Sequence, residues 1–238
     1  MSIPAKPDPH IRTVKSYVVR GGRLTSSQKQ AIDTLWQDFG LVTDQGLMDQ
    51  ERVFSRRAPL TFELGFGMGD SLLEMARLSP QRDFVGVDVH LPGIGALLRG
   101  IKANELNNIR IYRDDGKVVL RDCFADDSID CVQIFFPDPW HKKKHHKRRL
   151  IQPEFMQLVW QKLRPGGTVH LATDWENYAE HMLNVMGVVT GFRNRFGGNA
   201  CATDHGRPAT RFEKRGERLG HGVWDLIFEK TERQGDFD

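Results

Sequence analysis

The chain has 238 residues, of which 39% are hydrophobic and 27% charged, and its formal net charge is +3. This size and apolar content suit one globular domain with a substantial core and argue against a second full domain. The cysteines (Cys123, Cys131 and Cys201) lie far apart without a CxxC pair, which disfavours a disulfide framework or a zinc site. No apolar run approaches the roughly 18 residues of a spanning helix, and no signal pattern is visible, so we expect a cytoplasmic protein without a membrane segment.

The first 25 residues (1–25) carry five basic side chains against the single acid Asp8. We interpret this segment as a flexible basic arm, and composition alone leaves a solvated tail without a role as the alternative. A helix is predicted over Ser26–Phe39, where Ser26 or Ser27 can serve as the cap. Residues 26–238 are predicted to form one domain.

From Leu60 onward, short apolar runs rich in strand-forming residues alternate with segments of helical periodicity. This alternation predicts a Rossmann-like α/β fold, with about seven strands in a mostly parallel sheet, helices on both faces and an antiparallel final hairpin. The predicted strands are Leu60–Leu64, Asp83–Val89, Ile109–Arg113, Ser128–Phe136, Thr168–Thr173, Phe192–Phe196 and Val223–Glu229. The later predicted helices are Ser71–Leu78, Ile94–Leu106, Glu154–Leu163 (ended by Gly166 and Gly167) and Trp175–Val189.

A glycine-rich segment, Glu63–Gly69, joins the first predicted strand of the sheet to a predicted helix. Glycines such as Gly65 and Gly67 let a ligand lie close to the backbone. Three alternating glycines differ from the GxGxxG spacing of dinucleotide sites, and the absence of lysine and arginine from residues 60–76 excludes a phosphate-binding P-loop. A tight turn without a ligand is the alternative reading.

Acidic residues surround this glycine segment. Glu63 precedes it, Asp88 ends the second strand of the sheet, and Asp115 follows the third. The sequence leaves open whether Asp114 or Asp115 faces the ligand, and we favour Asp115. Carboxylates neutralise sulfonium and ammonium groups and accept hydrogen bonds from ribose hydroxyls and from an adenine amine. The sequence therefore predicts a site for S-adenosylmethionine.

An aspartate stands between two prolines and among aromatic rings in the run Phe135–Trp140. The prolines restrict the backbone around Asp138 at the end of a predicted strand, which favours a preorganised catalytic loop over a solvated turn. The next nine residues (141–149) contain six lysines or arginines, three histidines and no acid. Such charge beside a candidate catalytic loop indicates a nucleic-acid substrate, with an unpartnered surface run as the alternative, and disfavours a metal site.

Four segments in this order resemble the bacterial tRNA guanine-N7 methyltransferases: Glu63–Gly69, Phe135–Trp140 with the basic run after it, Ala172–Trp175, and Thr210–Gly216. The resemblance implies a class I methyltransferase fold and methyl transfer from S-adenosylmethionine to N7 of the variable-loop guanine at position 46 of tRNA. It implies cofactor contacts at Glu63, Asp88, Asp115 and Asp138. It implies substrate contacts at Lys142, Asp174, Thr210, Arg211, Phe212 and Glu213, and RNA binding by Lys144, His145, His146, Lys147, Arg148 and Arg149.

The chain departs from the family pattern at two places. Family members commonly carry glutamate where this chain has Asp88, so a ribose contact there would be one methylene shorter and could require a bridging water. The segment Asn194–Pro208 also matches only loosely. The ring that stacks on the target guanine is left open among Phe136, Trp140 and Trp175. Two rival functions are a methyltransferase of proteins or small molecules and an RNA-binding module without catalysis.

Overall fold

The structure is a computed structural model, and it describes residues 22–208 and 222–231. The helices are α1 (Ser26–Phe39), α2 (Gln50–Phe54), α3 (Asp70–Leu78), α4 (Leu91–Ala103), α5 (Gly116–Cys123), α6 (Pro153–Lys162) and α7 (Glu176–Val188), with 3₁₀ helices η1 (Thr43–Gln45) and η2 (Lys143–Arg148). The strands are β1 (Gly40–Leu41), β2 (Leu60–Leu64), β3 (Asp83–Val87), β4 (Ile109–Tyr112), β5 (Ile129–Phe135), β6 (Leu163–Thr173), β7 (Phe192–Asn194) and β8 (Trp224–Lys230).

These strands form one sheet of eight strands in the order β1-β4-β3-β2-β5-β6-β8-β7. The pairs from β1 to β6 are parallel, whereas β8 runs antiparallel to both β6 and β7. The prediction of a mostly parallel sheet with an antiparallel final hairpin is confirmed. The strand beyond the predicted seven is β1, whose two residues pair with Ile111 and Tyr112 and are too few to produce a recognisable pattern.

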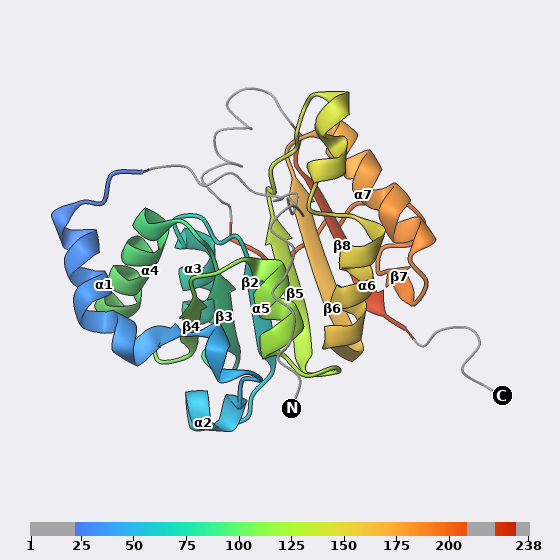
Figure 1. Cartoon of the computed structure of the whole chain (residues 1–238). Helices are drawn as coiled ribbons and strands as arrows, with labels where there is room; N and C mark the ends of the chain where they lie inside the picture. The colour runs from blue at the N-terminus through green and yellow to red at the C-terminus, as the bar shows by residue number, and fades with distance from the viewer. Residues whose placement is uncertain (1–21, 209–221, 232–238) are drawn as a thin grey trace, which may run out of the picture.

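Helices cover both faces of the sheet, as Figure 1 shows. One face packs against α1, α3 and α4 around residues such as Leu72, Ile94 and Ile111. The other face packs against α5, α6 and α7 around residues such as Phe62, Val132 and Met182. Because both faces are covered, the central strands consist mostly of buried residues, which is the pattern expected for parallel strands.

The signals predicted for the start of α1 and the end of α6 are wrong, and α4 lies at Leu91–Ala103 rather than at the predicted Ile94–Leu106. The N-cap of α1 is Thr25 rather than Ser26 or Ser27, because its hydroxyl accepts from the backbone N–H of Gln28 and the Gln28 side chain accepts from the Thr25 N–H. The glycine pair does not end α6. The helix ends at Lys162 and the chain turns at once into β6, where Leu163 already pairs with Ile129.

The helices predicted from the sequence do not include α2 and α5. The helix α5 begins after Asp115, whose carboxylate accepts from the Lys117 N–H as an N-cap. Its buried residues Val119, Leu120 and Cys123 recur at helical spacing, so the sequence did carry a signal for this helix. The helix α2 has only five residues and is capped by Asp49. Within residues 22–208 and 222–231, no helix is both long and apolar enough to cross a membrane.

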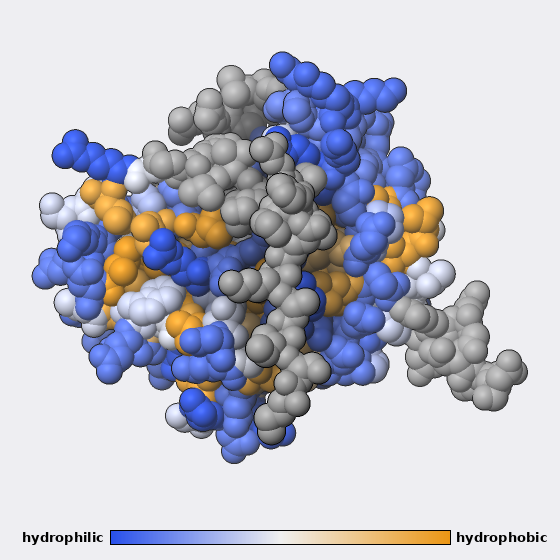
Figure 2. Space-filling model, viewed as in Figure 1, coloured by the Kyte–Doolittle hydropathy of each residue, from blue (hydrophilic) through white to orange (hydrophobic). Residues whose placement is uncertain are grey.

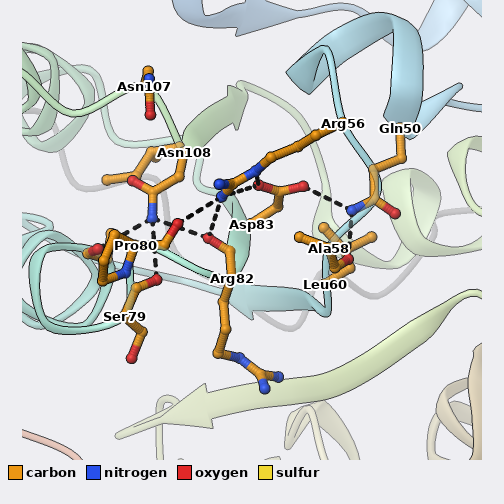
Figure 3. A network of polar contacts seen from close by, with 12 residues as sticks. Gln50, Arg56, Ala58, Leu60, Ser79, Pro80, Arg82, Asp83, Asn107 and Asn108 are labelled. Carbon is orange, nitrogen blue, oxygen red and sulfur yellow. Dashed lines mark hydrogen bonds and ion pairs between the residues drawn. The ribbon is translucent and has the colours of Figure 1, made fainter.

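A buried carboxylate fastens α2 to the start of β3, at the edge of the sheet where the parallel strands begin (Figure 3). Both oxygens of Asp83, which is 0% exposed, are paired. Arg56 donates to Oδ1 from Nε at 2.9 Å and from a terminal nitrogen at 2.7 Å, and Gln50 donates to Oδ2 at 2.8 Å. Beside this group, Asn108 donates to the backbone carbonyl of Arg82 at 2.9 Å. These contacts hold the loops that lead into the central strands.

Asp83→Ala is expected to lower the free energy of unfolding by about 2 kcal/mol, because Arg56 and Gln50 lose their shared acceptor while Arg56 can turn partly to solvent. Urea denaturation measures the loss. Glu51→Ala, which removes an exposed pair with Arg57, serves as the matched control and should cost under about 0.5 kcal/mol. Equal losses in the two variants would contradict the structural role of Asp83.

Candidate functional site

The candidate site lies along one edge of the sheet, where five neighbouring parallel strands end. Strands β4, β3, β2, β5 and β6 are adjacent and parallel, so their carboxyl ends lie in a row. The loops after these strands carry Asp115, Asp88, Gly65, Asp138 and Asp174 respectively. Residues far apart in the sequence are therefore brought to one edge of the sheet, and open α/β sheets bind ligands in the crevice at this edge.

The glycine segment after β2 exposes backbone to this crevice. Gly65 and Gly67 have positive φ angles of 80° and 60°, and a Cβ at either position would have no heavy atom within 4 Å. A third glycine, Gly93 of α4, lies so close that its Cβ would stand 1.8 Å from the carbonyl oxygen of Gly67. Gly93 was not among the residues predicted from the sequence, although the Pro-Gly pair just before a predicted helix was an available signal.

Asp88 braces the same loop. Its Oδ2 accepts from the backbone N–H of Gly67 at 2.8 Å, and its Oδ1 accepts from the backbone N–H of His90 at 2.8 Å. Burial raises the pKa of Asp88, and these backbone hydrogen bonds oppose that effect. Asp88, which is one methylene shorter than the glutamate common in the family, thus connects the loop after β2 with the loop after β3. Its predicted contact with a ribose stays a prediction.

Glu63 is the buried acid of the site. Its residue is 2% exposed on the central strand β2, and its Oε2 has no hydrogen-bond partner among the described residues. Burial, followed by the charge of Asp88, raises the pKa of Glu63 to about 8. A buried carboxylate without a partner is costly. The arrangement is therefore suited to a cationic ligand that enters the crevice and neutralises Glu63.

The two acids after β4 have different local roles. Asp115 is half-buried and caps α5, whereas Asp114 accepts from the Thr43 hydroxyl at 3.1 Å and from the Asp115 N–H at 2.7 Å. Asp114 also lines a cavity of about 270 Å³. The other residues of its wall are mostly apolar and come from α1, α4, β1, β4 and the residues that follow β1 and β4: Ile32, Trp36, Leu41, Val42, Thr43, Leu91, Ile94, Tyr112 and Arg113.

The loop after β5 carries Asp138 in an unusual backbone. Phe136 and Trp140, which flank the Pro137–Asp138–Pro139 unit, have φ angles of 50° and 48°, in the left-handed region that favours glycine. The Phe136 N–H donates to the carbonyl of Ala172 at 2.8 Å, so the loop leaves the sheet beside the end of β6. Asp174, one residue beyond β6, is half-buried on the neighbouring loop.

The basic run forms η2 and projects from this edge. In Figure 1 it lies in the yellow-green segment at the top, and the same region is hydrophilic in Figure 2. Lys142, Lys144 and Lys147 are exposed, and the Arg148 guanidinium lies 4.1 Å from the centre of the Trp140 ring. His145 and His146 are half-buried. Partial burial and then the neighbouring cations lower the pKa of His145, so it adds little charge at neutral pH.

Arg149 does not fit the expectation of a direct RNA contact. Its residue is only 2% exposed, because the guanidinium turns inward beneath the Asp138 loop. The Nε group donates to the carbonyl of Pro139 at 2.9 Å, and a terminal nitrogen donates to Oδ1 of Asn177 at 2.8 Å. The remaining predicted substrate residues, Thr210, Arg211, Phe212 and Glu213, lie outside the described residues.

This fold and edge define a class I S-adenosylmethionine-dependent methyltransferase. The residues present fit such a donor, since buried Glu63 and the open backbone at Gly65 and Gly67 suit a cation held against the chain. Solved structures share the fold. One is the 16S rRNA methyltransferase KamB, with a TM-score of 0.54, 16% identity and coverage of 78% of this chain and 95% of that chain. Another is the 16S rRNA (adenine(1408)-N(1))-methyltransferase from Catenulisporales acidiphilia, with a TM-score of 0.52, 13% identity and coverage of 82% and 93%.

The chain belongs to the tRNA (guanine-N(7)-)-methyltransferase family. The enzyme of that name from Ectopseudomonas mendocina is 56% identical over 222 residues, which cover 93% of each chain. The family described as "Putative methyltransferase" matches residues 57–226, a span that contains every strand after β1 through the first part of β8.

The pKa of Glu63 predicts how donor binding depends on pH. Below pH 8 the acid is protonated in the free protein, and a cationic donor requires the carboxylate, so affinity should rise about tenfold per pH unit between pH 6 and 8 and then level off. Calorimetric titration with S-adenosylmethionine measures the profile. Glu63→Gln should lack this rise. The amine of the donor also titrates, but it affects the parent protein and the variant equally, so the difference between the two profiles reports Glu63. Parallel profiles in the two proteins would contradict the prediction.

Proposed function

We infer that this protein transfers the methyl group of S-adenosylmethionine to N7 of a guanine in tRNA, and that the guanine is the one in the variable loop. The observation that carries the inference is the placement of Asp138 on a stiff loop at the same edge as the buried acid Glu63, beside an exposed basic segment. The family of the chain supports the same chemistry. Because the substrate is tRNA, we also propose that the protein acts in the cytoplasm.

The donor is proposed to lie across the ends of β2, β3 and β4. S-adenosylmethionine supplies a methyl group activated by a sulfonium centre. In this arrangement Glu63 would neutralise positive charge on the donor, and Gly65 and Gly67 leave room for it against the backbone. Asp88 and Asp115, which follow the neighbouring strands β3 and β4, would contact its ribose and adenine. The cavity beside Asp114, with its apolar walls, is the proposed place for the flat adenine ring.

Asp138 is the proposed catalytic residue, at the interface between donor and base. Guanine N7 carries an in-plane lone pair and no proton, so its attack on the methyl group requires no general base. Catalysis then rests on alignment and on electrostatics. A carboxylate held by two prolines can either stabilise the positive charge that the purine gains or hold the base by accepting from its N–H groups. We propose that Asp174, on the adjacent loop after β6, shares the holding of the base.

Trp175 is the proposed stacking partner of the target guanine. The three candidate rings differ in their surroundings, because arginine side chains lie over Phe136 and Trp140, at 5.4 Å and 4.1 Å from the ring centres. Trp175 keeps 36% of its surface exposed and touches His141 edge-on. Extruded bases in RNA are commonly held on such exposed aromatic rings.

The direct test of the activity is a transfer assay with labelled S-adenosylmethionine. Bulk tRNA, a protein extract and a metabolite fraction are incubated separately with the enzyme, and we expect label in tRNA. Label in protein or metabolites instead would favour the first rival function. Binding of tRNA together with no thermal shift on addition of the donor would favour a non-catalytic RNA-binding module.

Asp138→Asn is expected to lower kcat on tRNA by about 10²-fold or more while leaving donor affinity mostly intact, because it removes the carboxylate charge without removing its bulk. Single-turnover transfer and calorimetry provide the two measurements. Asp122→Asn, which removes an exposed acid of α5, is the control and should keep normal turnover. A near-normal kcat for Asp138→Asn would remove this residue from the mechanism.

Alanine at Lys144, Lys147 and Arg148 together is expected to weaken tRNA binding and to flatten its salt dependence by roughly 0.7 to 0.9 in log–log slope for each phosphate that the variant no longer binds. Filter binding over a series of salt concentrations measures the slope. The control is Arg57→Ala, which removes an exposed cation at the opposite edge of the sheet. If the slope of the triple variant equals that of the parent protein, η2 does not bind RNA phosphates.

A further inference from the structure

Two buried arginines contact the loop that carries Asp138. Arg149 contacts Pro139, which follows the aspartate in the chain, and Arg207 contacts Phe136, which precedes it. The loop requires such support, because Phe136 and Trp140 both have positive φ and neither is a glycine. Non-glycine residues in this region persist where the surrounding structure fixes them, and such residues cluster at functional sites. The side chains that fix the loop are therefore candidates for residues that control the position of Asp138.

On the side that follows Asp138, Arg149 ties the loop to α7. Its Nε donates to the carbonyl oxygen of Pro139 at 2.9 Å, directly after the aspartate in the chain. Its terminal nitrogen donates to Oδ1 of Asn177 at 2.8 Å, and its guanidinium lies 4.7 Å from the ring centre of Tyr178. Because Asn177 and Tyr178 belong to α7, this one guanidinium relates the loop to a helix that packs on the core.

On the side that precedes Asp138, Arg207 lies against the ring of Phe136 at 5.4 Å. The Arg207 side chain is 1% exposed and binds Asp225 of β8 with two nitrogens, each at 2.7 Å. His170 of β6 adds a third contact to Asp225 at 2.6 Å. Burial opposes ionisation of Asp225, but the hydrogen bonds from His170 and Arg207 lower its pKa to about 2. The sheet thus fixes the position of Arg207 through Asp225 of β8.

We propose that Arg149 and Arg207 are positioning residues, which hold Asp138 where methyl transfer takes place. The proposal rests on the catalytic role of Asp138 given above. Neither guanidinium is exposed enough to bind RNA, although Arg149 directly continues the basic run and both lie close to the site. Each offers its planar fork to fixed acceptors, a geometry that lysine does not reproduce. Arg149 acts on the backbone carbonyl of Pro139 and Arg207 acts on the ring of Phe136, so the two residues control turnover from positions on either side of the aspartate in the chain.

The test compares Arg149→Gln and Arg207→Lys with Arg56→Lys, all in the full-length protein. Arg56 also forks onto a buried carboxylate, but it lies at the opposite edge of the sheet. We expect kcat at saturating donor and tRNA to fall about 10²-fold in the first two variants, with the dissociation constants of both substrates nearly unchanged. Arg56→Lys should lower the unfolding midpoint and keep kcat. Equal effects of all three variants on kcat would overturn the proposal.

A milder substitution keeps the proposal testable if Arg149→Gln or Arg207→Lys does not fold. Asn177→Ala removes an exposed residue that anchors Arg149 and should lower kcat about tenfold while the unfolding midpoint changes little. Combining Arg149→Gln with Asp138→Asn should add little to the effect of Asp138→Asn alone, because both act through one group. If Asp138→Asn is inactive but the Arg149, Arg207 and Asn177 variants keep full kcat, only this inference fails. If Asp138→Asn keeps full kcat, the catalytic assignment fails as well.

Discussion

The parallel register of five neighbouring strands is the constraint on which the whole site depends. Because β4, β3, β2, β5 and β6 run in the same direction, their ends place an acid or a glycine loop side by side along one edge. Burial of Glu63 at that edge then sets the chemistry, since it raises the pKa of this carboxyl group and leaves one of its oxygens without a partner among the described residues. A cationic donor is the ligand that such an edge stabilises best.

The aspartate of the proposed transfer step depends on a second constraint, the rigidity of its loop. Prolines restrict the backbone next to Asp138, and the left-handed residues on either side give the loop a shape that local propensity alone would not select. Tertiary contacts select it instead, with Arg149 joining the loop to α7 and Arg207 joining it to β8. The contacts that stabilise the loop are therefore the same contacts that would position Asp138 against the base.

Much of this could be predicted from the sequence, because strand patterns and short motifs are local. The order of the strands along the chain, the glycine segment and the acids at the strand ends follow from hydrophobic periodicity and spacing. The sequence could not distinguish half-buried Arg148 from fully buried Arg149, since the inward direction of Arg149 depends on Asn177, 28 residues further along the chain. By contrast, α5 could have been predicted, because its buried residues recur at helical spacing directly after a capping aspartate, Asp115.

The most direct test of the central claim is to locate the methyl group on tRNA by chemistry. Bulk tRNA is methylated with the purified protein, reduced with borohydride and treated with aniline, which cleaves the chain where guanine carries an N7 methyl group. The account predicts cleavage at one guanine in the variable loop, dependent on both protein and donor. Incorporation of methyl label into tRNA without cleavage, or with cleavage elsewhere, would contradict it.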